Sequence, residues 1–307
     1  MNPAVFAFSD GGTAASDLAR ACGIPLYPIE SRRFPDGESL VTVKGRADTA
    51  FLYRSLDDPN GKLVEILLAC SALRDGGATK VVLVSPYLSY MRQDTAFHAG
   101  EAVSQKVIGR VLASNFDGVV TVDPHLHRTG SLSEVMPGIA AITLSAAPVL
   151  ASAIAADHPT PDTILVGPDS ESRPWVEAVA RPFGFRTLVG QKTRKGDREV
   201  ILEIPEIAEV KGRRVIIVDD LISSGTTLAS CAAMLARSGA RIIEAYATHC
   251  LAQPEDIAEM KTAGISRIFA TNSTNHALGV VSLSGILANG IAAQGWLKAT
   301  STEGGPA

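Results

Sequence analysis

Short runs of consecutive apolar residues alternate along the chain with longer, Ala-rich segments of helical period. Continuous Val, Ile and Leu runs of this kind are typical of parallel strands that are buried on both faces. We expect strands at 4–8, 50–54, 80–85, 118–122, 140–144, 163–166, 213–218, 241–247 and 267–270. The clearest helices are expected at 13–21, 63–74, 103–113 and 227–238. This βαβ rhythm predicts open, twisted, mostly parallel sheets with helices on both faces.

The alternation of strands and helices begins again after a proline-rich segment, which indicates two domains. Residues 158–161 read His-Pro-Thr-Pro and precede a fresh apolar strand. A chain of 307 residues has room for two cores of ordinary size. We therefore expect one domain over 1–148 and a second over 149–295, followed by a frayed tail over 296–307.

Composition narrows the classes of function. The chain has 28 Lys and Arg against 32 Asp and Glu, a net charge of −4, which gives no overall attraction to nucleic acid or anionic membranes. The four cysteines are far apart and form no C-x-x-C pair for a metal or redox site. No apolar run reaches the roughly 18 to 20 residues that span a bilayer, and no signal peptide is recognisable. We expect a cytoplasmic protein that binds neither nucleic acid nor membrane.

The most informative segment is an apolar strand that ends in two acids and a small, hydroxyl-rich turn. Val-Ile-Ile-Val at 215–218 is followed by Asp219 and Asp220, and a helix comes at once after the turn. The turn residues are Ser223, Ser224, Gly225, Thr226 and Thr227. Backbone N–H groups and hydroxyls at a helix N-terminus suit a phosphate, and the carboxylates can accept hydrogen bonds from ribose hydroxyls, directly or through a metal. An ordinary turn with a serine cap is the alternative, but it does not explain two adjacent acids at the end of a buried strand.

The run V-D-D-L-I-S-S-G-T-T resembles the phosphoribosyl-pyrophosphate loop of type I phosphoribosyltransferases and their relatives. This resemblance implies a fold of two lobes of the type I phosphoribosyltransferase kind, each a mostly parallel sheet with helices on both faces. It also implies that Asp219, Asp220 and the turn at 223–227 bind ribose 5-phosphate. The commonest family pattern has an acid followed by Thr-Gly where this chain has Ser223-Ser224-Gly225. The motif alone identifies a superfamily and leaves the reaction open.

Three further segments in the first half carry chemistry, although each also has a plain structural explanation. R-R-F-P-D-G-E at 32–38 sets an aromatic ring beside acids, which suits an adenine, yet the residues alone favour a β-turn at 35–37. P-Y-L-S-Y-M-R-Q-D at 86–94 has an anion-binding composition, yet an isolated Arg92 reads as a surface cation. V-D-P-H-L-H at 122–127 offers an acid and two imidazoles, but no companion ligands for zinc.

Two segments in the second half complete the set. G-P-D at 167–169 places Asp169 at a strand end. Q-K-T-R-K-G-D-R-E at 191–199 holds four cations and two acids, and without context a solvated loop explains this run equally well.

In order and spacing these five segments resemble those of ribose-phosphate diphosphokinase, also called phosphoribosyl pyrophosphate synthetase, over nearly the whole chain. The stretch after His125 is more similar to archaeal members. The resemblance implies Mg²⁺ as cofactor, with His125 and Asp169 near the metal, and nominates Lys192 and Arg194 as catalytic cations on a flexible loop. It leaves His127 without a role. The ATP-binding residues that it implies are Phe34, Asp36, Glu38, Arg92, Gln93, Asp94 and His125.

The reaction implied by the resemblance transfers the β,γ-diphosphoryl group of ATP to the 1-hydroxyl of ribose 5-phosphate, giving 5-phosphoribosyl 1-diphosphate and AMP. In the family the adenine loop is lent by a neighbouring subunit, which implies a homo-oligomer of at least two chains. A phosphoribosyltransferase that consumes the diphosphate would share 219–227 but would have no use for the F-P-D-G-E and R-Q-D segments. A catalytically weak regulatory relative is a second alternative, against which Lys192 and Arg194 argue. Walker and protein-kinase phosphate motifs are absent from the sequence.

Overall fold

The computed structural model describes residues 2–126, 128–158, 162–195 and 199–298, and for residues 192–195 and 199–202 the description covers the backbone alone. The chain divides into two compact units. The first consists of Met1–Leu144 together with Leu283–Ala307, and the second of Ser145–Ser282. The sequence pattern had placed residues 283–295 with the second domain. They group with the first unit because α9 (Ser284–Ala293) packs against α1 (Gly12–Cys22) and against the edge of the first sheet.

The first unit is built on a seven-stranded sheet in the order β3-β2-β1-β4-β5-β6-β7. All neighbouring strands are parallel except β3, which runs antiparallel to β2 as the second arm of a hairpin. The strands are β1 (Ala4–Phe8), β2 (Leu26–Arg33), β3 (Ser39–Val43), β4 (Thr49–Tyr53), β5 (Lys80–Val84), β6 (Gly118–Val122) and β7 (Ala140–Leu144).

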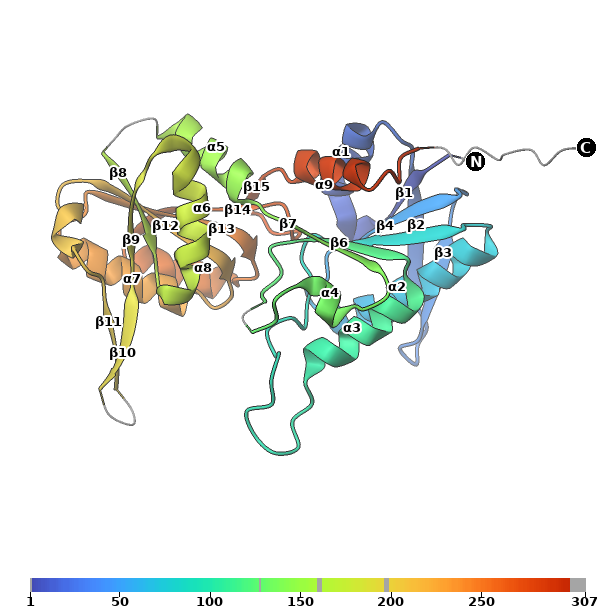
Figure 1. The fold of residues 1–307 in the computed structure, drawn as a ribbon, viewed down its shortest axis with the longest axis horizontal. Helices are drawn as coiled ribbons and strands as arrows, with labels where there is room; N and C mark the ends of the chain where they lie inside the picture. Colours follow the sequence, from blue (N-terminus) through green and yellow to red (C-terminus); the bar gives the residue numbers. More distant parts are fainter. Residues whose placement is uncertain (1, 127, 159–161, 196–198, 299–307) are drawn as a thin grey trace, which may run out of the picture. The chain divides into compact units, whose positions relative to one another are not determined.

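Helices cover both faces of this sheet, and Figure 1 shows α1 and α9 on one face and α2 (Pro59–Asp75) and α3 (Ser104–Asn115) on the other. Each central strand is apolar on both faces because it lies between these layers; all five residues of β1 are buried. The unit also contains η1 (Ser9–Gly11) and the short α4 (Leu132–Val135).

The second unit has a six-stranded, fully parallel sheet in the order β15-β14-β13-β12-β8-β9. Its strands are β8 (Thr163–Gly167), β9 (Arg186–Val189), β12 (Arg214–Ile222), β13 (Ile242–Cys250), β14 (Ile265–Thr271) and β15 (Gly279–Val281). A separate antiparallel hairpin joins β10 (Gln191–Lys195) to β11 (Glu199–Glu203) and extends away from the sheet (Figure 1). Helices α5 (Ala147–Asp157) and α6 (Arg173–Ala180) pack together, as do α7 (Thr226–Arg237) and α8 (Pro254–Thr262). Short helical turns are η2 (Ser170–Ser172), η3 (Arg181–Phe183) and η4 (Ile207–Val210).

The predicted fold class is confirmed in both units, but two local predictions need correction. The strand expected to stop at residue 218 continues to Ile222, so Asp219 and Asp220 lie within β12. The segment at 191–199 begins as strand β10 and so is not a loop throughout.

Within the described residues, no helix is both long and apolar enough to cross a membrane.

Candidate active site

Most of the predicted site residues lie at the carboxyl ends of parallel strands, the edge at which open α/β sheets bind ligands. In the first unit they follow β5 and β6, with one further group in the turn between β2 and β3. In the second unit they follow β8 and occupy the end of β12 and the turn before α7. The ATP-binding candidates therefore belong to the first unit and the ribose 5-phosphate candidates to the second.

The β2–β3 turn is a tight hairpin that holds Phe34, Asp36 and Glu38 on its surface. The Phe34 amide donates to the Glu38 carbonyl at 2.8 Å, and the Asp36 carboxylate accepts from the Glu38 amide at 3.1 Å. The Arg32 guanidinium lies 4.7 Å from the centre of the Phe34 ring. The hairpin thus presents an aromatic ring and two acids on a well-defined backbone, which an adenine could use for stacking and hydrogen bonding.

The long loop after β5 holds Arg92 and Gln93 through contacts with the start of α3. The Gln93 side-chain oxygen accepts from Ser104 at 3.0 Å, and Gln105 donates to the Met91 carbonyl at 3.1 Å. Arg92 remains exposed. The loop therefore offers a cation and an amide on a backbone that is fixed before any ligand arrives.

Asp94 is engaged by a residue that the sequence analysis did not single out, Arg128. One Asp94 oxygen accepts from the Arg128 backbone amide at 3.0 Å and the other from its guanidinium at 2.8 Å. Burial raises the pKa of Asp94, but these hydrogen bonds outweigh that effect and lower it overall. Arg128 follows V-D-P-H-L-H directly in the sequence, and only the fold reveals that it returns to the R-Q-D loop.

The segment after β6 carries His125 on an unusual backbone. Asp123 is 6% exposed and has a φ of 37°, in the left-handed region that a non-glycine residue seldom adopts. Its amide donates to the Leu144 carbonyl at 2.9 Å, which ties the turn to β7. His125 is partly buried two residues further on. His127 lies outside the described residues.

In the second unit three carboxylates come together at the ends of β8 and β12. Burial raises the pKa of Asp219 well above its ordinary value, and the charges of Asp220 and Asp169 raise it further. Asp169 is fixed because its carboxylate caps η2, accepting from the amides of Glu171 at 3.1 Å and Ser172 at 3.3 Å. This concentration of negative charge would be relieved by a cation.

The turn that follows β12 places its hydroxyls at the N-terminus of α7. Gly225 is the residue before the helix and has a φ of 71°, while the Ser224 and Thr226 hydroxyls lie 3.1 Å apart. Ser223 and Thr227 are partly exposed beside them. A phosphate bound here would meet hydroxyl donors and the positive end of the helix dipole.

The predicted catalytic cations lie on β10. Lys192 pairs with Leu202 and Arg194 with Val200 in the β10–β11 hairpin. Their side chains, and residue Gly196, lie outside what the structure describes.

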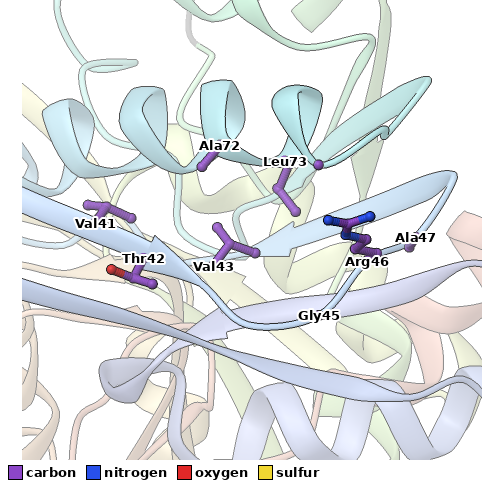
Figure 2. Close-up of a pocket in the computed structure, with 9 residues that line it drawn as sticks. Val41, Thr42, Val43, Gly45, Arg46, Ala47, Ala72 and Leu73 are labelled. Carbon is purple, nitrogen blue, oxygen red and sulfur yellow. The ribbon is translucent and has the colours of Figure 1, made fainter.

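Two surface cavities in the first unit lie away from these residues. One, of about 300 Å³, lies between β3 and the end of α2, with Arg46 as its one charged lining residue (Figure 2). The other, of about 470 Å³, lies beside β1, β2 and the start of α1. Neither cavity is lined by a predicted site residue. The candidate active site is therefore identified by the chemistry of its side chains and by their position at the strand ends.

Comparison with known proteins matches both units. A family model described as the N-terminal domain of ribose phosphate pyrophosphokinase matches residues 4–115, and a phosphoribosyl transferase domain model matches residues 145–283. Ribose-phosphate pyrophosphokinase from Methanopyrus kandleri is 33% identical over 91% of this chain and 95% of its own length. The enzyme of the same name from Thermococcus kodakarensis is 34% identical over 80% and 85%. Both relatives are archaeal, as expected from the stretch after His125.

A solved structure supports the same assignment. The phosphoribosylpyrophosphate synthetase from Mycobacterium smegmatis superposes with a TM-score of 0.83 at 25% identity, over 96% of this chain and 99% of the other. The match to a relative of more than 30% identity covers nearly the full length of both chains. Family models also match both units. The chain belongs to the ribose-phosphate pyrophosphokinase family.

Proposed function

We propose that this chain is an active ribose-phosphate diphosphokinase. The 1-hydroxyl oxygen of ribose 5-phosphate attacks the β-phosphorus of ATP, the bond between that phosphorus and the oxygen bridging to the α-phosphate breaks, and AMP leaves. The hydroxyl proton is lost to solvent. The products are 5-phosphoribosyl 1-diphosphate and AMP. One observation carries the proposal: a single chain holds the ribose-phosphate turn at 223–227 and also the two N-terminal segments that a phosphoribosyltransferase would not need.

Each group of residues has a role that follows from its chemistry. The 34–38 hairpin would hold the adenine, Arg92 and Gln93 the phosphates of ATP, and the 223–227 turn the 5-phosphate. Asp94 is already paired with Arg128, so it would shape the loop and leave ATP contact to its neighbours. Negative charge develops on the transferring oxygens, and Lys192 and Arg194 would stabilise it, with no covalent protein intermediate required.

The acidic cluster of the second unit fits the Mg²⁺ that this family implies. Mg²⁺ prefers oxygen ligands and is commonly held by one or two carboxylates plus substrate phosphates. Among the described residues, no group of three or more acidic, His or Cys side chains is arranged to enclose a metal by itself. Asp169 and the Asp219–Asp220 pair would therefore hold an ion that arrives with a substrate. When bound, Mg²⁺ would neutralise phosphate charge. The role of His125 rests on the resemblance, because imidazole is a poor magnesium ligand.

The setting of the reaction is also a proposal. ATP and ribose 5-phosphate would be the substrates, in the cytoplasm. The chain would act as a homo-oligomer of at least two copies, in which the 34–38 hairpin of one copy serves ATP bound to another.

The direct test is to incubate the purified protein with ATP, Mg²⁺ and ribose 5-phosphate, and to follow AMP and ADP separately. We expect AMP and phosphoribosyl diphosphate, formed only when the sugar is present. ADP as product would indicate a sugar kinase and contradict the proposal. Turnover of phosphoribosyl diphosphate with a free base, without use of ATP, would favour the phosphoribosyltransferase alternative.

Replacing one proposed catalytic cation tests the mechanism. We expect Lys192→Ala to lower kcat by about a hundredfold to a thousandfold, because one electrostatic contact to the transition state is lost, while the fold is unchanged. Lys211→Ala, which removes an exposed lysine after η4, is the matched control and should keep full turnover. A Lys192→Ala protein with normal kcat would remove Lys192 from the mechanism.

A further inference from the structure

The first turns of α2 contact both loops that are proposed to bind ATP, although no residue of α2 belongs to either loop. The helix begins at Pro59, and its residues Asn60, Gly61 and Glu65 face different neighbours. Its start is tied to the segment between β4 and α2: the Lys62 ammonium donates to the Ser55 carbonyl at 3.1 Å and to the Asp57 carboxylate at 2.9 Å. The first turn of α2 is therefore held in place by the segment that precedes Pro59.

Glu65 connects α2 to the hairpin that carries Phe34, Asp36 and Glu38. Its carboxylate accepts from the hydroxyl of Ser39, the residue that follows Glu38 directly, at 3.2 Å. The same carboxylate lies 2.6 Å from the Arg54 guanidinium, and both side chains are less than one-tenth exposed. Arg54 in turn lies 3.9 Å from the centre of the Phe8 ring. Because Glu65 is fixed by a buried ion pair, the base of the hairpin is fixed with it.

A second contact joins the same hairpin to the helix. The Arg33 guanidinium lies over the backbone of Gly61, so close that a Cβ at Gly61 would be 2.7 Å from it. Arg33 is the residue before Phe34. The two arms of the hairpin, at Arg33 and Ser39, thus both rest on α2.

Asn60 connects α2 to the loop that carries Arg92 and Gln93. Its side-chain oxygen accepts a hydrogen bond from the Tyr90 hydroxyl. Tyr90 has a φ of 64°, a left-handed conformation that costs a non-glycine residue free energy and persists only where neighbouring contacts impose it. The Asn60 contact holds the side chain of this residue, two positions before Arg92.

We infer that Asn60 and Glu65 are positioning residues for nucleotide binding. Through Asn60 the first turns of α2 fix the 86–94 loop, which serves ATP bound to the same copy, and through Glu65 they fix the 34–38 hairpin, which serves ATP bound to another copy. This inference rests on the proposed function, since it assigns both loops to ATP. Neither residue touches the nucleotide. Each lowers the entropy cost of binding by fixing a loop beforehand, so its loss weakens ATP binding and leaves the chemical step intact.

The test measures the dissociation constant of MgATP by calorimetry without sugar, and kcat and both KM values in the full reaction. Asn60→Leu removes the acceptor for Tyr90, whereas Asn60→Asp keeps an acceptor oxygen. We expect Asn60→Leu to bind MgATP about threefold to tenfold more weakly, the range that loss of one hydrogen bond produces. Asn60→Asp should bind like the wild type. For Asn60→Leu, kcat and the KM for ribose 5-phosphate should stay within about twofold.

The hairpin contact has its own variant. Ser39→Ala should likewise raise the KM for ATP without changing kcat. Ser152→Ala, which removes an exposed serine hydroxyl on α5, is the matched control that should leave ATP binding unchanged.

Two results would overturn the inference. One is MgATP binding by Asn60→Leu that equals the wild type. The other is a loss that appears equally in the KM for ribose 5-phosphate and is not restored in Asn60→Asp, since this describes general destabilisation. A wild-type protein that binds MgATP but forms no AMP would overturn the proposed function, while the binding measurements would still decide the inference.

Discussion

At the residue scale, the candidate site is shaped by contacts that fix side chains before a substrate binds. Asp169 caps η2 and Asp94 is held by Arg128, so neither carboxylate has to be ordered when a ligand arrives. Gly225 likewise fixes the backbone of the turn before a ligand arrives. Its φ of 71° turns the chain from β12 into α7, and its missing side chain leaves room for the buried Met260. Preorganisation of this kind lowers the entropy cost of binding.

Gly225→Ala tests this close packing. A Cβ at this position would lie 2.6 Å from the Met260 sulfur, in addition to the strain of a left-handed residue with a side chain. We expect the free energy of unfolding to fall by about 1 to 2 kcal/mol from the backbone alone, and further because Met260 must move. The KM for ribose 5-phosphate should rise. Urea unfolding and steady-state kinetics measure the two effects.

Gly212→Ala is the matched control for this change. Gly212 has a φ of 75°, but a Cβ there would have no atom within 4 Å. The variant therefore carries the same backbone strain without the contact. If Gly225→Ala is destabilised no more than Gly212→Ala, the contact with Met260 has no energetic weight.

At the scale of elements, a group of charges around the buried Glu244 joins four elements of the second unit near the start of its central strands. Glu244 of β13 is 1% exposed and lies 2.8 Å from Arg214 of β12 and 2.9 Å from His158 at the end of α5. Arg267 of β14 also donates to it. Burial raises the pKa of Glu244, but hydrogen bonds from Arg267 and Arg214 outweigh that effect and lower it overall. Burial lowers the pKa of His158, and the attraction of Glu244 only partly opposes this.

These shifts predict a fall in stability on mild acidification. His158 has a folded-state pKa below its ordinary value of 6.5, so the unfolded chain takes up the proton first as the pH falls. Its contribution is complete above pH 6.5 and is lost as the pH falls through the folded-state pKa. The contribution of Glu244 is lost only below its ordinary value of 4.5, so it stays present in this range. Urea unfolding at pH 7.5 and 5.5 should therefore include a loss of stability from His158. Asp219 contributes a change of the opposite sign, because its raised pKa favours the folded state as the pH falls.

A histidine replacement isolates that part of the pH dependence. His158→Gln should lose less stability than the wild type between pH 7.5 and 5.5, because no proton can be taken up at this position. His98→Gln, which replaces an exposed histidine of the first unit, should behave like the wild type. Equal pH slopes for all three proteins would show that His158 does not control this range.

The sequence pattern revealed some elements and missed others for identifiable reasons. Buried parallel strands such as β5 and β6 read as continuous apolar runs, and they were predicted almost to the residue. The β2–β3 and β10–β11 hairpins carry many polar or charged residues, so their segments read as turns or loops. The carboxyl extension of β12 was missed because two aspartates interrupt its apolar pattern.

At the scale of the whole molecule, the periodic pattern predicted two α/β units but could not assign every helix to its unit. Helical periodicity shows that a segment has a face to bury, but it does not identify the surface that covers it. The apolar residues of α9 fit either sheet. In the same way, the F-P-D-G-E and R-Q-D segments were recognisable by resemblance, whereas Arg128 and the contacts of α2 depend on long-range folding and leave no local signal.

The first unit should therefore depend on a segment that is remote from it in the sequence. Leu287 and Ile291 of α9 are buried, and the Trp296 ring packs so closely on β6 that a Cβ at Gly118 would lie 2.9 Å from it. Burial of such side chains stabilises by about 1.5 to 3 kcal/mol each, so a chain that ends at Ser282 should lose about 5 kcal/mol from its first unit. That is a large share of the free energy of unfolding of an ordinary domain, which is about 5 to 15 kcal/mol.

Hydrogen exchange measures this loss. In the chain that ends at Ser282, the amides of β6 and β7 should exchange faster, while β12 and β13 keep their protection. A chain that ends at Lys298 retains α9 and Trp296 and is the matched control. Equal protection of β6 and β7 in the two shortened chains would mean that α9 covers the first sheet without stabilising it.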